Sequence, residues 1–406
     1  MKLKQTGFLI ALVFGLIVSA CTDDMGPLDD NGPVISESSQ GAIQMTNNGA
    51  ARRMIVVFKE GADLEAQGQK LRGFGVATLS KLNKIHAISA MIPEHANSVL
   101  LNDPSILRID EDVIVSIKKK PDGVGKPPKD EPDEPDNQQT PYGITLINAD
   151  GLANTGSGVN VAVFDTGIDY NHPDLAANVK GGINTINTKK SYKDDNGHGT
   201  HVSGTIAALD NSEGVVGVAP QANLYGVKVL DRSGSGYLSD IIEGLEWAEV
   251  NGIDVINMSL STDSDIQSFE DAVDYACNSA GIVIVCAAGN DGTTVDYPAA
   301  YASTIAISAI DSTYAVPYWS NIGKPIDFAA PGVGIKSTWL KGKYNTISGT
   351  SMSSPHAAGI AALAVAANSS ATPAHIMSIM VSHADYIGSL TSNQQGNGVV
   401  DASAGL

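Results

Sequence analysis

The C-terminal two-thirds of the chain alternates short apolar runs with segments of helical pattern. The apolar runs are VNVAVFD, ANLYGVKVL, IDVINMSL and IVIVCAAGN, and helix-like segments at 199–209, 237–250 and 268–280 separate them. Continuously apolar strands joined by helical crossovers are typical of a parallel sheet with helices on both faces. The pattern therefore predicts an α/β domain, which we assign to residues 140–406.

A second group of elements precedes this domain, over residues 51–118. MIVVF, HAISAMI and ILRIDEDVIVSI have strand-like patterns, whereas 62–72 and 94–102 have helix-like patterns. Strands that alternate with two helices predict a small α+β domain of the ferredoxin-like kind. Residues 21–50 and 119–139 are polar or rich in Pro and charge, so we expect a flexible tether and an extended linker there.

The N-terminus has the features of an export signal. Lys2 and Lys4 precede an apolar run at 7–18, which is too short for a membrane-spanning helix. The following VSAC resembles the lipobox of bacterial lipoproteins, which implies a signal peptide of residues 1–20 and lipidation of Cys21. An ordinary secretory signal is the alternative, and both hypotheses place the mature protein outside the cytoplasm. We expect no transmembrane helix elsewhere.

Charge and cysteine content narrow the possible partners. The chain has 25 Lys and Arg against 44 Asp and Glu, a net charge of −19. This balance argues against binding nucleic acid or an anionic membrane surface through a basic patch. Cys277 and Cys286 either form a disulfide, which an exported protein permits, or remain buried thiols.

Four polar residues lie at predicted strand or helix ends. Asp165 ends VAVFD, Asn290 ends IVIVCAAGN, His198 lies between two glycines, and Ser351 precedes the helix-like AAGIAALAVAA. The carboxyl ends of parallel strands gather functional groups at one edge of a sheet. Ser351 is either a helix cap or a nucleophile that benefits from the positive potential of a helix N-terminus.

Four motifs in order resemble the subtilisin-like serine proteases (subtilases). They are DTGID at 165–169, HGTHVSGT at 198–205, AAGN at 287–290 and GTSMSSP at 349–355. The resemblance covers about 140–406 and implies a monomeric endopeptidase that cuts protein or peptide substrates through an acyl-enzyme.

The same resemblance implies a role for each residue. Ser351 would be the nucleophile, His198 the general base, and Asp165 the group that orients the imidazole. Asn290 would donate its side-chain amide to the oxyanion, together with the Ser351 N–H.

Some of these motifs also occur in enzymes with other chemistries. DTG also occurs in aspartic proteases, but these need two such aspartates and the chain has one DTG. His198 and His201 lack the i,i+4 spacing and the glutamate of a zinc protease, so we expect His201 and His356 to be structural. An inert lipoprotein and a transpeptidase remain as alternatives.

The resemblance also assigns a substrate groove. Substrate would add as a strand between two enzyme segments. These segments are Gly234-Ser235-Gly236 and Ser259-Leu260-Ser261, with Leu238, Ile241 and Leu260 lining the pocket for the fourth residue before the cut. Ser261-Thr262 replaces the usual Gly-Gly, which we expect to narrow the groove.

The primary specificity pocket carries two aspartates. Asp296 stands where relatives often have Gly or Asn, and Asp291 follows the oxyanion asparagine. A carboxylate there would favour Lys or Arg before the cut. The alternative is that both are solvated loop residues.

Residues 52–118 resemble the inhibitor-type propeptide of subtilases, whose C-terminus occupies the active site as a product. This match puts Lys118 in the primary pocket and Val115 in the apolar pocket, and predicts self-cleavage at Lys118–Lys120. An unrelated small domain that stays attached is the alternative.

Calcium is implied by the same resemblance. Oxygen ligands of the kind that suit Ca²⁺ match a site in relatives. The matching residues are Gln138, Asp174, Leu209, Asn211, Glu213 and Val215, with Glu213 contributing only its carbonyl.

Overall fold

The computed structural model describes residues 50–118, here called the small region, and 137–406, the large region. Both lie in one compact unit that spans 46–406. The predicted signal peptide with Cys21, the tether up to residue 49 and linker residues 119–136 fall outside the described residues.

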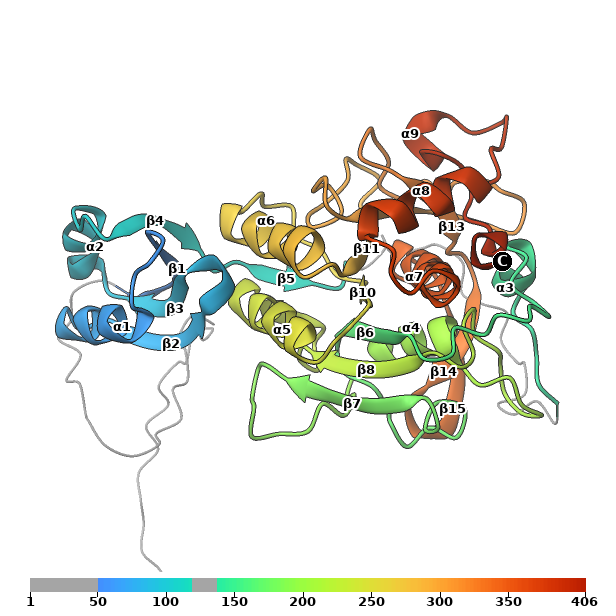
Figure 1. Ribbon diagram of the computed structural model, residues 1–406, viewed down its shortest axis with the longest axis horizontal. Coiled ribbons are helices and arrows are strands. Elements are labelled where there is room, and N and C mark those ends of the chain that lie inside the picture. Colours follow the sequence, from blue (N-terminus) through green and yellow to red (C-terminus); the bar gives the residue numbers. More distant parts are fainter. Residues whose placement is uncertain (1–49, 119–136) are drawn as a thin grey trace, which may run out of the picture. The chain divides into compact units, whose positions relative to one another are not determined.

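A seven-stranded sheet forms the centre of the large region (Figure 1). Its order is β13-β12-β11-β10-β6-β8-β7, and all neighbouring strands are parallel. The strands are β6 Asn160–Asp165, β7 Val179–Asn184, β8 Asn223–Lys228, β10 Val255–Met258, β11 Val283–Ala287, β12 Ile305–Ile310 and β13 Phe328–Pro331. The four predicted apolar runs are the adjacent strands β11, β10, β6 and β8.

Helices cover both faces of this sheet, which confirms the predicted fold class. Val161 and Val163 of β6 pack on the side of α4 (His198–Ala207) and α7 (Thr350–Ala367). Ala162 and Phe164 pack on the side of α5 (Leu238–Val250) and α6 (Gln267–Asp274). Apolar side chains on successive residues, pointing to opposite faces, explain why such strands are apolar throughout.

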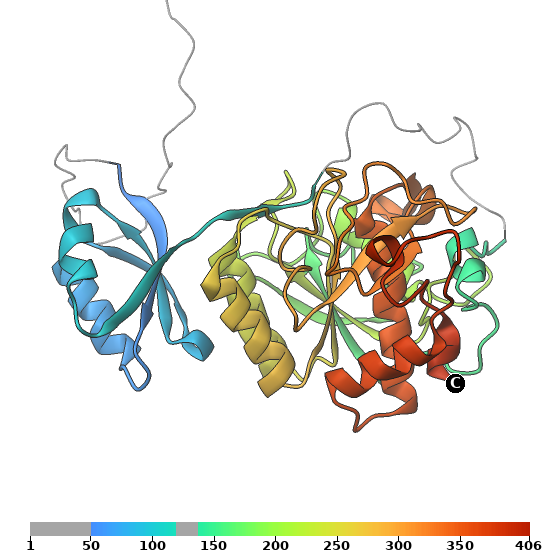
Figure 2. The ribbon, with the colours of Figure 1, turned by 90° about the horizontal axis from the view of Figure 1, so that it is seen from above.

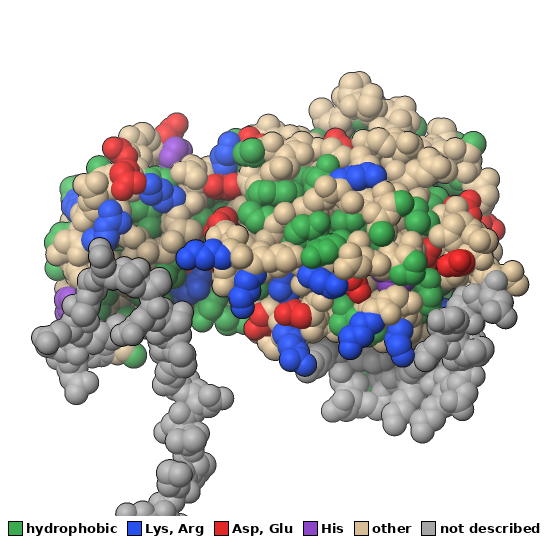
Figure 3. All heavy atoms as spheres, turned by 90° about the horizontal axis from the view of Figure 1, so that it is seen from below, with side chains coloured by type: hydrophobic (Ala, Val, Ile, Leu, Met, Phe, Trp, Pro, Cys, Tyr) green, Lys and Arg blue, Asp and Glu red, His purple; other side chains and the backbone are tan. Residues whose placement is uncertain are grey.

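Shorter elements complete the large region. They are α3 Tyr142–Leu146, β9 Ser235–Tyr237, the hairpin strands β14 Ile335–Trp339 and β15 Lys343–Ile347, α8 Pro373–His383 and α9 Ser392–Gln395. No helix within 50–118 or 137–406 is both long and apolar enough to cross a membrane. Basic and acidic side chains are mixed along the face drawn in Figure 3.

The small region has the ferredoxin-like order of elements. These are β1 Arg52–Phe58, α1 Leu64–Gly73, β2 Ala77–Leu82, β3 Ala87–Ile92, α2 Glu94–Leu101 and β4 Ile106–Glu111. The sheet order is β2-β3-β1-β4, with every neighbouring pair antiparallel. The chain then continues into β5 (Ile114–Ser116), which pairs with β9 of the large region (Figure 2).

Candidate active site

Asp165 and His198 form a buried pair at the carboxyl edge of the sheet. Asp165 is the last residue of β6 and His198 is the first of α4. The His198 Nδ1 lies 2.9 and 2.8 Å from the two carboxylate oxygens of Asp165. This contact leaves Nε2 as the ring nitrogen that can exchange a proton with substrate. The partner of Asp165 is a histidine, which argues against the aspartic-protease alternative.

The chain segments that carry this pair are fastened to each other. Thr166 Oγ1 donates to Asp194 at 2.9 Å and accepts from the Gly199 N–H at 3.0 Å. A Cβ at Gly199 would lie 2.2 Å from the Gly167 carbonyl oxygen, so only glycine permits this approach. The close fit fixes the orientation of the imidazole relative to the carboxylate.

Ser351 lies in the first turn of α7 and is 4% exposed. The N-cap of this helix is Gly349, so the Ser351 hydroxyl is not a cap. Among the described residues, this hydroxyl donates to the Ser259 carbonyl at 3.3 Å rather than to His198. In return, the Ser259 hydroxyl donates to the Ser351 carbonyl at 2.8 Å. The nucleophile candidate is therefore held beside the groove wall.

The Asn290 side chain is fixed at one end and donates from the other. Its Oδ1 accepts from the N–H and the hydroxyl of Thr350, at 2.9 and 3.0 Å. This orients Nδ2 outward, where it donates to the carbonyl oxygen of Lys118 at 2.8 Å. A peptide carbonyl thus occupies the position in which an oxyanion would be stabilised.

The segment that ends at Lys118 lies between the two predicted groove segments. Ser116 pairs with Ser235 in β9 and exchanges backbone hydrogen bonds with Ser261 at 3.1 and 3.0 Å. The Ile117 N–H donates to the Gly234 carbonyl at 2.9 Å. The chain therefore occupies the groove as a central strand, despite the side chain of Ser261.

Val115 projects into an apolar pocket. It is fully buried, in the same hydrophobic cluster as the predicted lining residues Leu238, Ile241 and Leu260. Its pairing partner is Gly236, where a Cβ would lie 2.0 Å from the Val229 carbonyl oxygen. The backbone of the groove can therefore lie directly against the backbone that follows β8.

Lys118 lies beside the two predicted aspartates. Its Nζ is 3.3 Å from the Asp291 carboxylate and 4.0 Å from that of Asp296. Burial raises the pKa of Asp296, although the Ser261 hydrogen bond and the Lys118 charge oppose that shift. The Ser261 hydroxyl donates to Asp296 at 2.8 Å. The sequence assigns Ser261 to the groove wall and predicts that it narrows the groove, but it gives no sign of this contact with Asp296.

Two further histidines lie in the core. The His201 Nε2 faces the carbonyls of Ile335 and Asn345, at 3.0 and 3.1 Å. Burial, followed by the charge of His198, lowers the pKa of His201 to about 3. His356 contacts the Met352 carbonyl at 2.7 Å, and burial lowers its pKa to about 4. Both rings are held neutral, as expected of structural histidines.

The residues matched to a calcium site also meet in space. Gln138 Nε2 donates to the Leu209 carbonyl at 2.7 Å, and Asn211 Nδ2 donates to Asp174 Oδ1 at 2.9 Å. The backbone N–H of Val215 donates to Asp174 Oδ2 at 2.9 Å, and that of Glu213 to Asn211 Oδ1 at 2.6 Å. Burial raises the pKa of Asp174.

The two described cysteines are unbridged. Cys277 lies in the π-helical turn Tyr275–Ser279 and Cys286 lies in β11, and both are buried free thiols. Burial raises the pKa of each thiol, so neither is an activated nucleophile.

The chain is similar in sequence to known proteases. The sequence model of the Subtilase family matches residues 156–398. Subtilisin NAT of Bacillus subtilis subsp. natto is 40% identical over 379 residues, which are 90% of this chain and 93% of the relative. The thermostable alkaline protease of Halalkalibacterium halodurans is 39% identical, covering 90% and 96%. Subtilisin of Bacillus pumilus is 48% identical, covering 66% and 98%. The chain therefore belongs to the subtilase family and is a serine endopeptidase that acts on protein or peptide substrates.

Proposed function

We propose that the protein is made as a zymogen, in which residues 51–118 act as an inhibitory propeptide that the enzyme cuts from its own chain after Lys118. The hydrogen bond from Asn290 to the Lys118 carbonyl is the observation that carries this proposal. The strand pairing of 114–116 supports it, because the segment is bound as a substrate strand would be.

Catalysis would use Asp165, His198 and Ser351. The Ser351 hydroxyl turns from the Ser259 carbonyl toward His198 Nε2, gives up its proton there and bonds to the carbonyl carbon. The oxyanion accepts from Asn290 Nδ2 and the Ser351 N–H. His198 then protonates the leaving amine as the C–N bond breaks. Water, deprotonated by His198, releases the acyl group.

The proposed substrate preference is Lys or Arg before the cut. The half-exposed Asp291 lies nearest the ammonium group, and the buried Asp296 lies deeper. Ser261 holds Asp296 with its hydroxyl, so the carboxylate keeps its place when the pocket empties. A buried carboxylate without a cation is costly, which favours a cationic side chain over an apolar one.

Calcium would bind at Asp174 and its neighbours, and the residues present fit this ion. The Gln138 and Asn211 side chains present their amide nitrogens to the Leu209 carbonyl and to the buried Asp174 carboxylate, and half a turn of each amide would bring its oxygen to the same place. Carboxylate, amide and carbonyl oxygens are the donor set that suits Ca²⁺. A Cβ at Gly214 would lie 2.4 Å from Asp174 Oδ2, so glycine keeps this space open. The bound ion would neutralise Asp174 and fasten residue 138 to the 209–215 loop.

Removal of calcium provides the test of that site. Chelation should lower the thermal midpoint of the large region, and Asp174→Asn should abolish the difference between chelated and calcium-loaded protein. An equal response of Asp174→Asn and the parent chain would contradict the proposed ligands.

Export and lipid anchoring through Cys21 complete the proposal. They rest on the sequence of residues 1–21. Cys21→Ser should move the protein from the membrane fraction to the soluble fraction, whereas retention in the membrane would argue against the anchor.

Self-cleavage is tested by following the chain after synthesis. The parent should release a fragment with Lys118 as its C-terminus, and Ser351→Ala should remain uncut, with peptidase activity reduced by about 10⁶. Asn290→Ala should cut slowly, because loss of one oxyanion donor costs about 10²–10³ in kcat. Mass spectrometry locates the cut, and a parent chain cut elsewhere would refute the assignment of Lys118.

A further inference from the structure

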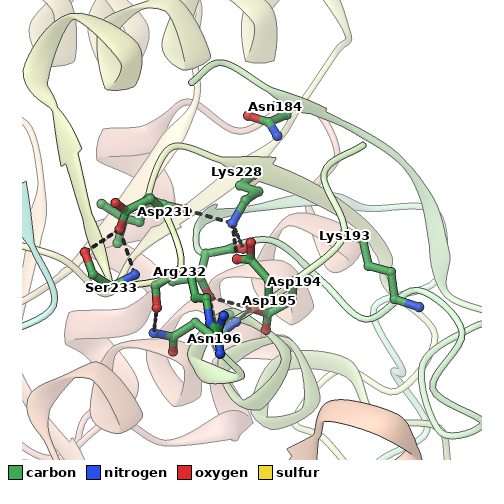
Figure 4. Close-up of polar contacts among 12 residues, drawn as sticks. Asn184, Lys193, Asp194, Asp195, Asn196, Lys228, Asp231, Arg232 and Ser233 are labelled. Atoms are coloured by element: carbon green, nitrogen blue, oxygen red, sulfur yellow. Dashed lines mark hydrogen bonds and ion pairs between the residues drawn. The ribbon is translucent and has the colours of Figure 1, made fainter. Parts of the chain in front are cut away.

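We infer that Lys228 is a positioning residue for the Asp165–His198 pair. Its buried ammonium group, which Asp195 neutralises, joins the segment after Asp165 to the segment before His198. The inference rests on the proposed roles of Asp165 and His198. It concerns Lys228 and Asp195, which the four subtilase motifs do not include and which Figure 4 shows in contact.

Strand register places Lys228 beside the catalytic candidate. Lys228 ends β8, as Asp165 ends β6, and the two residues are paired in the parallel register. The Lys228 side chain is only 7% exposed. Its Nζ donates to the Thr166 carbonyl at 2.6 Å, to Asp195 Oδ1 at 2.7 Å and to the Leu230 carbonyl at 3.0 Å. Three acceptors satisfy all three donors of an ammonium group, which makes its burial tolerable.

The two carbonyl contacts enclose the backbone of Asp165. The N–H groups of Val229 and Leu230 both donate to the Asp165 carbonyl at 3.1 Å. Lys228 then binds the carbonyls of Leu230 and Thr166. Since the Thr166 N–H donates to Asp165 Oδ1 at 2.7 Å, a displacement of Thr166 would turn the carboxylate itself.

The contact with Asp195 reaches the histidine side of the pair. Asp195 precedes Asn196, whose Oδ1 accepts from the His198 N–H at 3.1 Å and whose Nδ2 donates to the Arg232 carbonyl at 2.9 Å. The ion pair therefore connects β8 to the segment that begins α4. A second connection, from Thr166 to Asp194, runs parallel to it.

The ion pair also sets the local charge around His198. Among the described residues, the ionisable groups of this neighbourhood include Asp165 from β6, Asp194 and Asp195 from the segment before α4, His201 from α4, Lys228 from β8 and Asp231 just after β8. The Lys228 charge also reaches Asp231, which is not one of its three acceptors. For Asp231, burial works against ionisation, but hydrogen bonds from Ser233 and Ser235 and the Lys228 charge outweigh it and lower its pKa. Removing either partner should therefore change the field at His198, with opposite signs.

The test compares pH profiles of kcat/KM for variants of the mature enzyme on a reporter peptide. The acidic limb of this profile is the range in which kcat/KM falls as protons bind at low pH. Asp195→Asn leaves the Lys228 cation uncompensated, which disfavours protonated His198 and should move the acidic limb to lower pH by roughly 0.3 unit or more. Lys228→Met leaves Asp195 uncompensated and should move the limb to higher pH. It should also lower kcat by about tenfold with KM unchanged, because Thr166 and Leu230 lose their donor.

The double variant separates charge from position. Lys228→Met with Asp195→Asn restores neutrality, so the limb should return to its parental pH while kcat stays low. Lys193→Met is the matched control, since this lysine is 45% exposed and lies in the same segment as Asp195. Its limb should not move. Thermal midpoints and active-site titration correct for misfolded enzyme.

Two outcomes would overturn the inference. They are acidic limbs that stay in place in Asp195→Asn, and limbs that move in the same direction in both single variants. Because Asp195 is 53% exposed, Asp195→Asn is expected to fold even if Lys228→Met does not. Asp165→Asn in the same assay tests the proposed function separately, because full activity of this variant would refute the triad. If Asp165→Asn loses activity but the acidic limbs of the Asp195 and Lys228 variants stay in place, only the role of Lys228 is refuted.

Discussion

Polar contacts inside the large region differ from those that join it to the small region. Thr166, Asp194 and Thr200 form a network that is closed and buried. Several contacts between the regions use side chains that solvent can reach, such as Arg53 at 22% exposure and Lys118 at 24%, although the contact of Asp112 with Ser239 is buried. Water can replace a partly exposed contact more easily than a buried one. This contrast is what the proposed roles require, in which the first set positions the catalytic residues and the second set holds a propeptide that must later separate.

Apolar packing shows the same division. One face of the small sheet, with Val56 and Phe58, packs on its own helices. The other face, with Ile55 and Val57, shares a hydrophobic cluster with α5 and α6. The small region therefore completes its burial only by contact with the large region, whereas the large region contains its own core.

Acid should produce the largest difference between the regions, because it acts on the large region's buried histidines. Burial lowers the pKa of His201 to about 3 and that of His356 to about 4, whereas an unfolded histidine titrates near pH 6.5. Below about pH 6.5 the unfolded chain therefore binds more protons, so the stability present above that pH is lost as pH falls toward 4.

The measurement is the thermal midpoint of Ser351→Ala, which cannot digest itself, between pH 7.5 and 4.5. His356→Gln in the same background should reduce the slope of midpoint against pH. Burial raises the pKa of Asp327 to about 6, so this group makes the protein more stable as pH falls and opposes the effect of the histidines. The role of His356 is therefore read from the difference between the two variants, not from the pH dependence of either one alone. An unchanged slope would show that His356 is not the titrating group.

The second-largest effect is expected at Asp296, a residue of the large region that lies 4.0 Å from the ammonium group of Lys118 in the small region. Asp296→Asn keeps the shape and removes the charge, so kcat/KM for Lys over Leu before the cut should fall by about 10². Asp291→Asn is the matched control: its carboxylate is 43% exposed, and the loss should be only a few-fold. Equal losses would show that the deeper carboxylate has no special role.

The sequence predicted four adjacent strands of the large sheet but not the interior strand β12, IAISAI, or the edge strands. The four apolar runs became the adjacent strands β11, β10, β6 and β8, because burial on both faces demands such runs. The edge strand β7, VKGGIN, has neither an apolar run nor an alternating pattern and was missed. Strand β2 of the small region, ATLSKL, was missed for the same reason.

The candidate site shows a similar limit. Residues at strand ends, such as Asp165 and Asn290, could be located because strand direction fixes where they gather. The contacts of Ser261 with Asp296 and of Lys228 with Asp195 join residues more than 30 positions apart. No local pattern encodes such pairs, since they depend on loop paths that tertiary packing decides.

Arg53 gives the smallest effect and a sharp test of the comparison, because two of its three polar partners, Ser239 and Asp240, belong to the large region. It donates to Asp112 at 2.6 Å, to the Ser239 hydroxyl at 2.7 Å and to Asp240 at 3.2 Å. Arg53→Met should leave kcat and KM of the mature enzyme unchanged, since the mature enzyme would no longer contain it. It should shorten the lag between self-cleavage and the appearance of activity by about tenfold, because a charge-assisted contact is worth about 1.5–3 kcal/mol and part of this one is exposed.

Arg52→Met is the control: its ion pair with Glu111 lies within the small region at 71% exposure, and the lag should stay the same. Equal lags for Arg53→Met and the parent would mean that apolar packing on α5 and α6, rather than charge, holds the small region in place.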